Sequence, residues 1–197
     1  RSSPTPHRSC KPHATMNVLL HTCCAPCASH CVLALHERGH AVTLFYSNAN
    51  IAPHDEFLKR LDAVHLLAER LRVPLLIDEP DHDVWLREVA HGLEQEPESG
   101  ARCARCFRYS LSRTHEAMLT HGSDAFTTTL TVSPHKHTPT IFQVGRDLDA
   151  ARFLPINFKR KDGFKQSIEF AKLFELYRQN YCGCEFSYRS KITVPKL

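Results

Sequence analysis

The chain carries nine cysteines, and seven of them fall in three short clusters that lie far apart in the sequence. The clusters are Cys23-Cys24-Ala25-Pro26-Cys27, Cys103-Ala104-Arg105-Cys106 and Cys182-Gly183-Cys184. Thiolates are soft ligands that suit zinc and iron–sulfur clusters. One Cys-x-x-Cys pair alone would be weak evidence, but three clusters in one short chain indicate a thiolate-rich metal site.

The number of clustered thiols limits the kinds of site that they can form. Seven are too many for one structural zinc, which takes four ligands in a closed tetrahedron. They suit a cubane iron–sulfur cluster with a second metal, or a cluster with one or two redox thiols. Two other interpretations stay open from spacing alone: a zinc-stabilised RNA-binding module without catalysis, and a dithiol oxidoreductase with reactive, metal-free thiols. Cys31, four residues past Cys27 on the same expected helix, is interpreted as a small core residue.

A second feature is the Thr-rich segment 127–132, which runs into a loop with an imidazole and an ammonium group. A Thr-rich edge strand with a solvated turn is the plainer interpretation of this pattern. Beside a metal site, however, such a loop could hold a polar ligand or deliver a proton. We therefore predict His135 and Lys136 as catalytic residues that supply protons.

Basic and aromatic side chains surround the second and third cysteine clusters. Arg and Tyr together suit an unstacked nucleotide, because rings stack on bases and guanidinium groups pair with phosphates. A solvated surface is the plainer explanation for any one of them. The residues that we predict to bind substrate are Arg105, Arg108, Arg178 and Tyr181.

Length and composition fit one domain with a hydrophobic core, at 197 residues of which 42% are hydrophobic. Lys and Arg outnumber Asp and Glu by 25 to 21, which permits a polyanionic partner without demanding one. No apolar stretch approaches the roughly 20 residues of a membrane span, and no signal-peptide core is evident. We therefore expect the protein to lie in the reducing cytoplasm, without membrane association. Clustered thiols bind metals or carry out redox chemistry in that compartment. Residues 1–15, which include Cys10, lack periodicity and are predicted to be a disordered extension.

Strands and helices alternate along the rest of the chain. Strands are expected over residues 17–20, 41–46, 73–77 and 125–130. Helices are expected over residues 28–38, 53–71, 81–89, 103–121, 140–151 and 164–177. This order predicts a parallel sheet with right-handed crossovers, in a single α/β metal-binding catalytic domain over residues 16–197. The first cysteine cluster directly follows the first strand, at the sheet edge where ligand sites collect in open parallel sheets.

Taken together, the motifs resemble one family, the cobalamin-independent epoxyqueuosine reductases known as QueH. The matching pieces are Leu19–Cys27, Arg102–Phe107, Phe126–Lys136, and Gly163–Lys165 followed by Tyr177–Ser187. The resemblance runs from Met16 to about Ser190 and is specific as a set, because all of the motifs occur in order. Phe107 and His137 depart from the Tyr and Asn that are common in the family, and neither departure removes an expected metal ligand.

The resemblance implies an enzyme that reduces the epoxide of epoxyqueuosine to the alkene of queuosine in the wobble nucleoside of tRNA. It implies a Rossmann-like parallel sheet with flanking helices, similar to the adenine nucleotide α-hydrolase-like fold. The glycine-rich phosphate loop of ATP-using relatives is absent, because the first cysteine cluster stands in its place, and we predict no use of ATP. The expected partners are tRNA with epoxyqueuosine in its anticodon and an external electron donor.

The resemblance also implies a 4Fe–4S cluster with an additional iron ion beside it, held by cysteines and a carboxylate. Asp81 is the predicted carboxylate ligand because it follows the third expected strand near the same sheet edge, and Asp83 is the second choice. Cys27 ranks behind the other clustered thiols as a ligand. The expected cysteine ligands, not divided between the cluster and the second iron, are Cys23, Cys24, Cys103, Cys106, Cys182 and Cys184.

Overall fold

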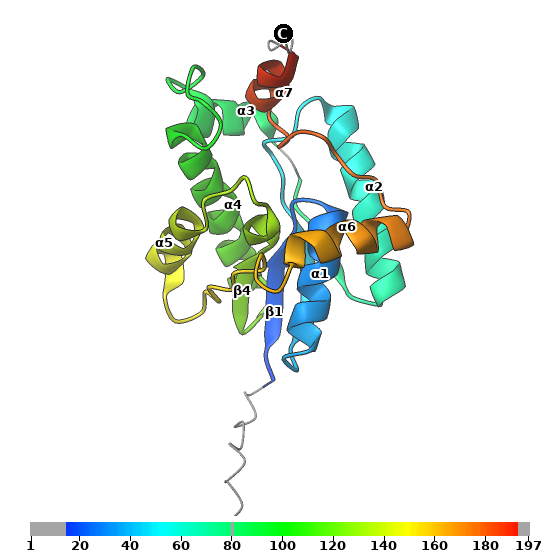
Figure 1. The fold of residues 1–197 in the computed structure, drawn as a ribbon. Helices are drawn as coiled ribbons and strands as arrows, with labels where there is room; N and C mark the ends of the chain where they lie inside the picture. Colours follow the sequence, from blue (N-terminus) through cyan, green and yellow to red (C-terminus); the bar gives the residue numbers. More distant parts are fainter. Residues whose placement is uncertain (1–14, 80, 193–197) are drawn as a thin grey trace, which may run out of the picture.

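The computed structural model describes residues 15–79 and 81–192 (Figure 1). The predicted extension over residues 1–15, with Cys10, lies outside these residues except for Thr15. No helix in the described ranges is both long and apolar enough to cross a membrane.

A four-stranded parallel sheet forms the centre of the molecule, as the alternation of strands and helices predicts. Its strands are β1 (Asn17–His21), β2 (Ala41–Tyr46), β3 (Leu75–Ile77) and β4 (Ala125–Thr128), in the spatial order β3-β2-β1-β4. The fourth strand is shorter than predicted, because the Thr128 side chain accepts a hydrogen bond from Leu130 N and the chain turns into a 3₁₀ helix over Thr129–Val132.

Helices cover both faces of the sheet because successive strand residues point to opposite faces. Val18 and Leu20 contribute to one hydrophobic cluster and Leu19 and Phe126 to another. Figure 1 shows α1, α2 and α6 on one side of β1 and α4 and α5 on the other. These helices are α1 (Ala25–His36), α2 (His54–Leu71), α4 (Ala101–Thr120), α5 (Thr138–Asp149) and α6 (Gly163–Leu173).

Two short helices lie together beyond the carboxyl ends of the strands (Figure 1). They are α3 (His82–Trp85), which continues into a π-helical turn over Leu86–Ala90, and α7 (Glu185–Ile192). Trp85 and Cys184 meet there in a small third hydrophobic cluster. Sequence periodicity did not predict α7, and it extended α6 as far as Tyr177. The helix ends earlier because Glu175 adopts a left-handed conformation with φ of 54°.

Candidate metal centre and substrate cavity

The first thiol group occupies the connection between β1 and α1. Cys23 and Cys24 follow the strand, and Cys27 lies in the first turn of the helix, which has Pro26 near its start. The Sγ atoms of all three lie within 4.8 Å of one another, and those of Cys23 and Cys24 are 3.8 Å apart. The helix amino terminus favours negative charge at this place. Three converging thiols at such a position are suited to a soft metal ion.

The thiols of this group differ in pKa. Hydrogen bonds from Cys23 and Cys27 hold the pKa of Cys24 well below its usual range. The same contacts act in the opposite sense on Cys27, whose pKa is raised by Cys23, by Cys24 and by burial. The group therefore ionises first at Cys24. A cation is needed before the other two can become thiolates as well, because thiolates in one buried site repel each other.

The start of the 3₁₀ helix after β4 holds Cys23 in place. Thr129 Oγ1 donates to Cys23 Sγ at 3.2 Å and lies 3.1 Å from Cys23 N, which donates to it. His21 is buried beneath, with Nδ1 2.9 Å from Thr128 Oγ1 and Nε2 3.2 Å from Ser47 O. Burial lowers the pKa of His21, so its imidazole is neutral near pH 7 and serves as a fixed hydrogen-bonding partner.

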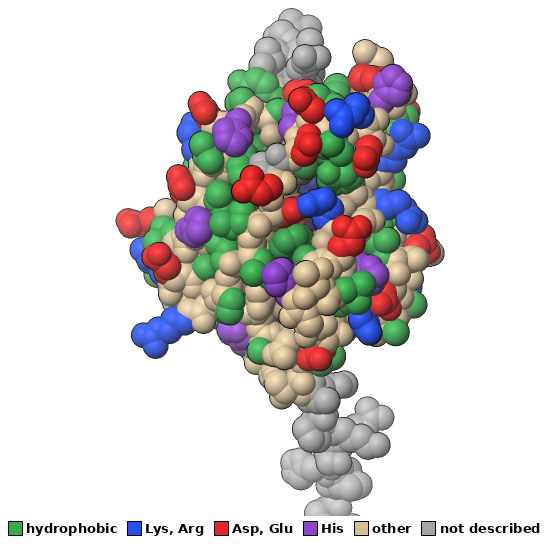
Figure 2. Space-filling view, turned by 180° about the vertical axis from the view of Figure 1, so that it is seen from behind, with side chains coloured by type: hydrophobic (Ala, Val, Ile, Leu, Met, Phe, Trp, Pro, Cys, Tyr) green, Lys and Arg blue, Asp and Glu red, His purple; other side chains and the backbone are tan. Residues whose placement is uncertain are grey.

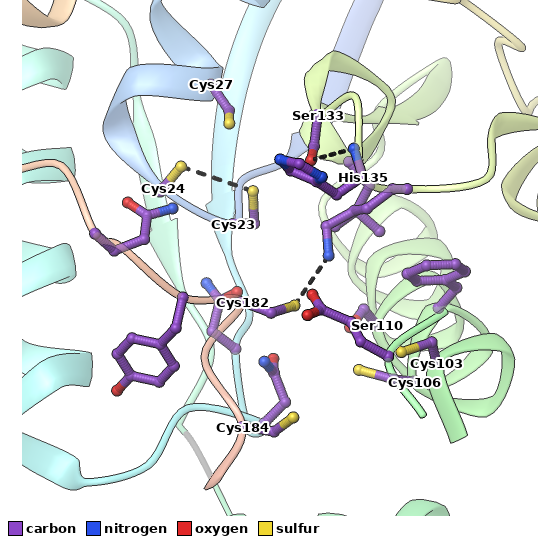
Figure 3. Close-up of a pocket in the computed structure, with 18 of the residues that line it drawn as sticks. Cys23, Cys24, Cys27, Cys103, Cys106, Ser110, Ser133, His135, Cys182 and Cys184 are labelled. Atoms are coloured by element: carbon purple, nitrogen blue, oxygen red, sulfur yellow. Dashed lines mark hydrogen bonds between the residues drawn. The ribbon is translucent and has the colours of Figure 1, made fainter. Parts of the chain in front are cut away.

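The other four clustered thiols reach the same cavity from two further elements. Cys103 and Cys106 lie in the first two turns of α4, and Cys182 and Cys184 lie on the irregular segment between α6 and α7. A cavity of about 420 Å³ is lined by these four and by the first thiol group. Figure 3 shows the Cys182 sulfur between the first group and the two cysteines of α4. The fold therefore brings all seven clustered cysteines to one cavity.

Cys27 and Cys31 differ from one another in this arrangement. Cys27, which sequence reasoning ranked behind the others, belongs to the closest thiol group found among the described residues. Cys31 is fully buried in the hydrophobic core beneath α1, as its position predicts. Burial raises the pKa of Cys31 well above its usual range, which keeps it a neutral thiol.

Lys136 places a positive charge inside the cavity. Its Nζ lies 3.0 Å from Cys182 Sγ and 5.5 Å from the centroid of the Phe107 ring. Its carbonyl accepts a hydrogen bond of 2.6 Å from Lys159 Nζ, which fixes the loop. Burial by itself would lower the pKa of Lys136, but electrostatic attraction to Cys182 and the hydrogen bond with it outweigh burial and raise the pKa. The side chain is therefore an ammonium group at every physiological pH.

His135, the other predicted proton donor, lies on the exposed part of the same loop and also lines the cavity. Its backbone is held at both ends, since Ser99 Oγ donates to His135 O at 3.2 Å and His135 N donates to Ser133 Oγ at 3.3 Å. Figure 3 shows the contact between Ser133 and His135. One loop thus carries an inner ammonium group and an outer imidazole.

The four predicted substrate-binding residues divide between two places. Arg178 and Tyr181 line the thiol cavity. Arg105 and Arg108 line a second pocket of about 370 Å³ over α4. Arg108 Nη2 also pairs with Asp147 Oδ2 of α5 at 3.2 Å. Figure 2 shows the rear face of the molecule, where basic and acidic side chains are interspersed. The face seen there offers no continuous basic surface.

The structure places the predicted carboxylate ligand Asp81 away from the cavity. Its Oδ1 accepts a hydrogen bond of 2.8 Å from Val84 N and caps α3, and its side chain is exposed. Asp83, the second choice, is exposed on the same helix. Among the residues of α3 it is Trp85 that lines the cavity, while Asp81 lies at the start of the helix and serves as its cap. Glu98 is the carboxylate that lines the cavity.

Arg102 explains why the loop before α4 brings Glu98 to the cavity. This arginine is buried, and its Nη1 donates to Leu93 O and to Glu96 O, each at 2.7 Å. The sequence predicted no helix, strand or functional residue between positions 94 and 100. The one available signal was that Glu98 lies five residues before Cys103.

Side-chain amides form the remaining polar wall of the cavity, and sequence reasoning did not identify them as functional. Asn48 Nδ2 donates to Thr22 O at 2.9 Å, which fixes it beside the first thiol group. Gln179 faces Cys24, and its Oε1 is buried with no hydrogen-bond partner in the described part of the chain. Amides offer both donors and acceptors, so they suit a heterocyclic base. The amide residues of the lining are Asn48, Asn50, Gln179 and Asn180.

The fold and the cavity define a Rossmann-like α/β protein with a thiol-rich, metal-competent cavity at the carboxyl edge of its sheet. The chain belongs to the QueH family: the family model described as "Epoxyqueuosine reductase QueH" matches residues 18–190. The family suggested by the sequence motifs is therefore confirmed.

Relatives named epoxyqueuosine reductase QueH match along nearly the whole chain. The protein from Streptococcus pyogenes serotype M1 is 34% identical over 180 residues, which cover 87% of this chain and 70% of that protein. The protein from Acinetobacter baylyi is 34% identical, with 87% and 80% covered. The protein from Thermotoga maritima is 32% identical, with 86% and 89% covered.

Among solved structures, the chain is similar to the U34-tRNA thiolase NcsA from Methanococcus maripaludis, determined with its [4Fe-4S] cluster. The TM-score is 0.53 at 12% sequence identity, and the match covers 92% of this chain and 65% of that chain. At this identity the likeness concerns the fold. It confirms the predicted class, a Rossmann-like parallel sheet similar to the adenine nucleotide α-hydrolase-like fold.

Proposed function

We propose that this protein reduces the epoxide of epoxyqueuosine to the alkene of queuosine at the wobble position of tRNA. The observation that carries the proposal is the family match over residues 18–190, a range that contains all seven cavity cysteines. Relatives named for this activity match along nearly the whole chain. A tRNA substrate would place the enzyme in the cytoplasm.

The donor set of the cavity fits a 4Fe–4S cluster with an additional iron ion. Seven soft thiols line one cavity, three of them with converging sulfur atoms. Glu98, in place of Asp81, is our candidate for the carboxylate ligand. When bound, these groups would supply one-electron transfer and a Lewis acid for the epoxide oxygen. The thiol ligands that we propose are Cys23, Cys24, Cys27, Cys103, Cys106, Cys182 and Cys184.

The overall reaction takes two electrons and two protons, and it releases the epoxide oxygen as water. The electrons come from an external donor. Lys136 stays protonated because its pKa is raised, so its Nζ can donate a hydrogen bond to the departing oxygen and offset its developing negative charge. His135, on the exposed side of the same loop, is placed to pass protons from solvent to the cavity.

Substrate binding follows from the size and lining of the cavity. The metal groups would take up part of the cavity of about 420 Å³, which leaves room for the epoxide-bearing part of one nucleoside, so the wobble nucleoside must leave the anticodon stack to reach it. Arg178 then pairs with the nucleotide at the cavity, and Tyr181, whose ring is buried and whose Oη donates to Ala52 O, contacts it as part of the cavity wall. Arg105 and Arg108, over α4, contact phosphates further along the tRNA.

The test is an anaerobic single-turnover assay. Protein reconstituted without oxygen is analysed for iron and sulfide, where about four sulfides and five irons per chain are expected. It is then mixed with tRNA that carries epoxyqueuosine and with a strong chemical reductant, and queuosine is measured in the digested tRNA. Cys182→Ser should lose product and part of the iron. Cys31→Ala is the matched control, because that thiol lies outside the cavity, and it should retain both.

Other outcomes separate the alternatives. A colourless protein that binds only zinc after reconstitution would favour the zinc-stabilised RNA-binding module. Reactive thiols with no metal would favour the dithiol oxidoreductase. Full iron and sulfide without queuosine would support the cluster and contradict the substrate.

A further inference from the structure

The segment that carries Cys182 and Cys184 belongs to no helix or strand, so something other than backbone pairing within an element must hold it. It lies against the loop that precedes α2. Ala52 N donates to Gly183 O at 3.0 Å, and Tyr181 Oη donates to Ala52 O at 2.7 Å. These two hydrogen bonds hold the segment against that loop.

Arg60, on α2, also binds the backbone of this segment. The side chain is buried, at 2% exposure. Its Nη1 donates to Cys182 O at 2.9 Å and its Nη2 to Tyr181 O at 3.3 Å. The guanidinium carbon also lies 5.2 Å from the centroid of the Tyr181 ring. One side chain thus contacts two consecutive carbonyls and the ring of the same segment, from 121 positions earlier in the sequence.

A buried carboxylate orients this guanidinium group. Arg60 Nε donates to Glu56 Oε1 at 2.7 Å, one helical turn away, and Glu56 Oε2 accepts a hydrogen bond of 2.8 Å from Tyr177 Oη. Both members of the pair are buried. Because a buried charge is costly unless it is paired and hydrogen-bonded, the pair can adopt few other arrangements. All three nitrogens of the guanidinium group therefore have acceptors.

The fit between Arg60 and the segment is close. Gly183 has φ of +141°, and a Cβ at this position would lie 3.3 Å from Arg60 Nη1 and 2.9 Å from Asn50 Nδ2. The planar guanidinium fork matches two adjacent carbonyls, which a lysine ammonium cannot do from the same stem. While the carbonyls of Tyr181 and Cys182 are held towards α2, the Cys182 sulfur reaches Lys136 Nζ inside the cavity.

We propose that Arg60 is a positioning residue, which holds the Tyr181–Cys184 segment so that the sulfurs of Cys182 and Cys184 face the cavity. Its importance for catalysis rests on the proposed function, since it matters there only if those sulfurs bind the metal groups. The hydrogen bonds from Arg60 to the segment form in the apoprotein, so their effect can be measured without metal or substrate.

The test compares Arg60→Lys with Lys59→Met, the neighbouring exposed cation on the same helix. Arg60→Lys keeps the charge beside Glu56 and removes the fork. The readout is the alkylation rate of each cysteine in the folded apoprotein, mapped by mass spectrometry. We expect the rates at Cys182 and Cys184 to rise about tenfold, the factor that follows from losing hydrogen bonds to a held segment. Cys103, Cys106 and the first thiol group should change little, and Lys59→Met should match the wild type.

A second variant guards against a simple folding defect. Glu56→Gln with Arg60→Met removes both buried charges together, so no unpaired charge remains. Circular dichroism and unchanged alkylation at Cys31 would show that the core is intact. Faster alkylation confined to Cys182 and Cys184 in either folded variant supports the proposal. Rates at those two cysteines equal to wild type in folded variants would overturn it. Failure of epoxyqueuosine reduction by the wild type would contradict the proposed function and leave this alkylation pattern unaffected.

Discussion

The cavity is built from two kinds of structure, and the first thiol group and the Cys182–Cys184 segment represent them. The first group lies where a strand passes directly into a helix, so the sheet register and the first helical turn set its sulfur positions. The later segment has no such support and depends on hydrogen bonds from distant side chains. Local backbone geometry fixes one half of the site, and tertiary contacts fix the other half. Substitutions should separate the two.

The largest effect should come from the first group itself. Cys24→Ser removes the thiol that ionises first and leaves the strand and the helix unchanged. We expect at least a roughly hundredfold loss of single-turnover rate, since changes even beside metal ligands cost ten- to a hundredfold. Iron analysis and the anaerobic assay measure this. Normal iron content and rate would remove this thiol from the site.

Lys136→Met removes the positive charge that lies beside Cys182 in the cavity. We expect about a hundredfold loss of single-turnover rate if the ammonium group donates a hydrogen bond to the departing oxygen. Because the pKa of Lys136 is raised, its ionic contribution to stability is complete below the ordinary lysine pKa of about 10.4 and is lost only as the pH rises beyond that value. The wild-type rate between about pH 6 and pH 9 should therefore show no limb from this residue. Lys172→Met, which removes an exposed lysine of α6, is the control. A titration in that window that disappears in Lys136→Met would contradict the assignment.

Gly183→Ala tests the Tyr181–Cys184 segment, which lies outside any helix or strand. The added methyl group would lie 2.9 Å from Asn50 Nδ2, and φ of +141° is strained for alanine. We expect a loss of about 1–3 kcal/mol in the free energy of unfolding or in local order, and a rate lower by about tenfold. Thermal unfolding and turnover give the two quantities. Gly92→Ala is matched to it, with φ of +75° and no atom within 4 Å of the new Cβ. Equal effects of the two changes would mean that strain alone is responsible.

The smallest effect is expected at Arg108, outside the thiol cavity. Its ion pair with Asp147 is exposed, so Arg108→Met should change the free energy of unfolding by less than about 0.5 kcal/mol. Binding of tRNA should weaken by a few-fold and depend less steeply on salt. Arg178→Met, at the cavity, should weaken binding more. Titrations at several salt concentrations compare the two, and an Arg108→Met variant with wild-type salt dependence would exclude a phosphate contact.

The sequence predicted most of what depends on local patterns. Strand alternation, the parallel sheet and the placement of the first cysteines at the sheet edge all follow from short-range periodicity. The closeness of Cys27 to Cys24 was available too, because residues three apart in a first helical turn share a face. Ranking Cys27 behind the others overlooked that geometry.

What the sequence did not predict depends on contacts between distant segments. Glu56 and Arg60, four apart on an amphipathic helix, look like a solvated surface pair, yet both are buried because the Tyr181–Cys184 segment covers them. Glu98 stands in a loop with no motif of its own, and hydrogen bonds from Arg102 and Ser99 hold that loop beside the cavity. Asp81 was predicted from a strand end alone, and the helix that follows β3 uses its carboxylate as a cap.

The separation of the thiols along the chain has a consequence for how the protein is made. Cys23, Cys24 and Cys27 lie close together in the sequence, at the junction of β1 and α1, so their sulfur atoms can converge once that strand and helix have formed. Cys182 lies 122 positions after Arg60, so the hydrogen bond from Arg60 to its carbonyl can form only after that whole stretch has been made. The cavity therefore lacks two of its seven thiols until the Tyr181–Cys184 segment has been made and has reached Arg60.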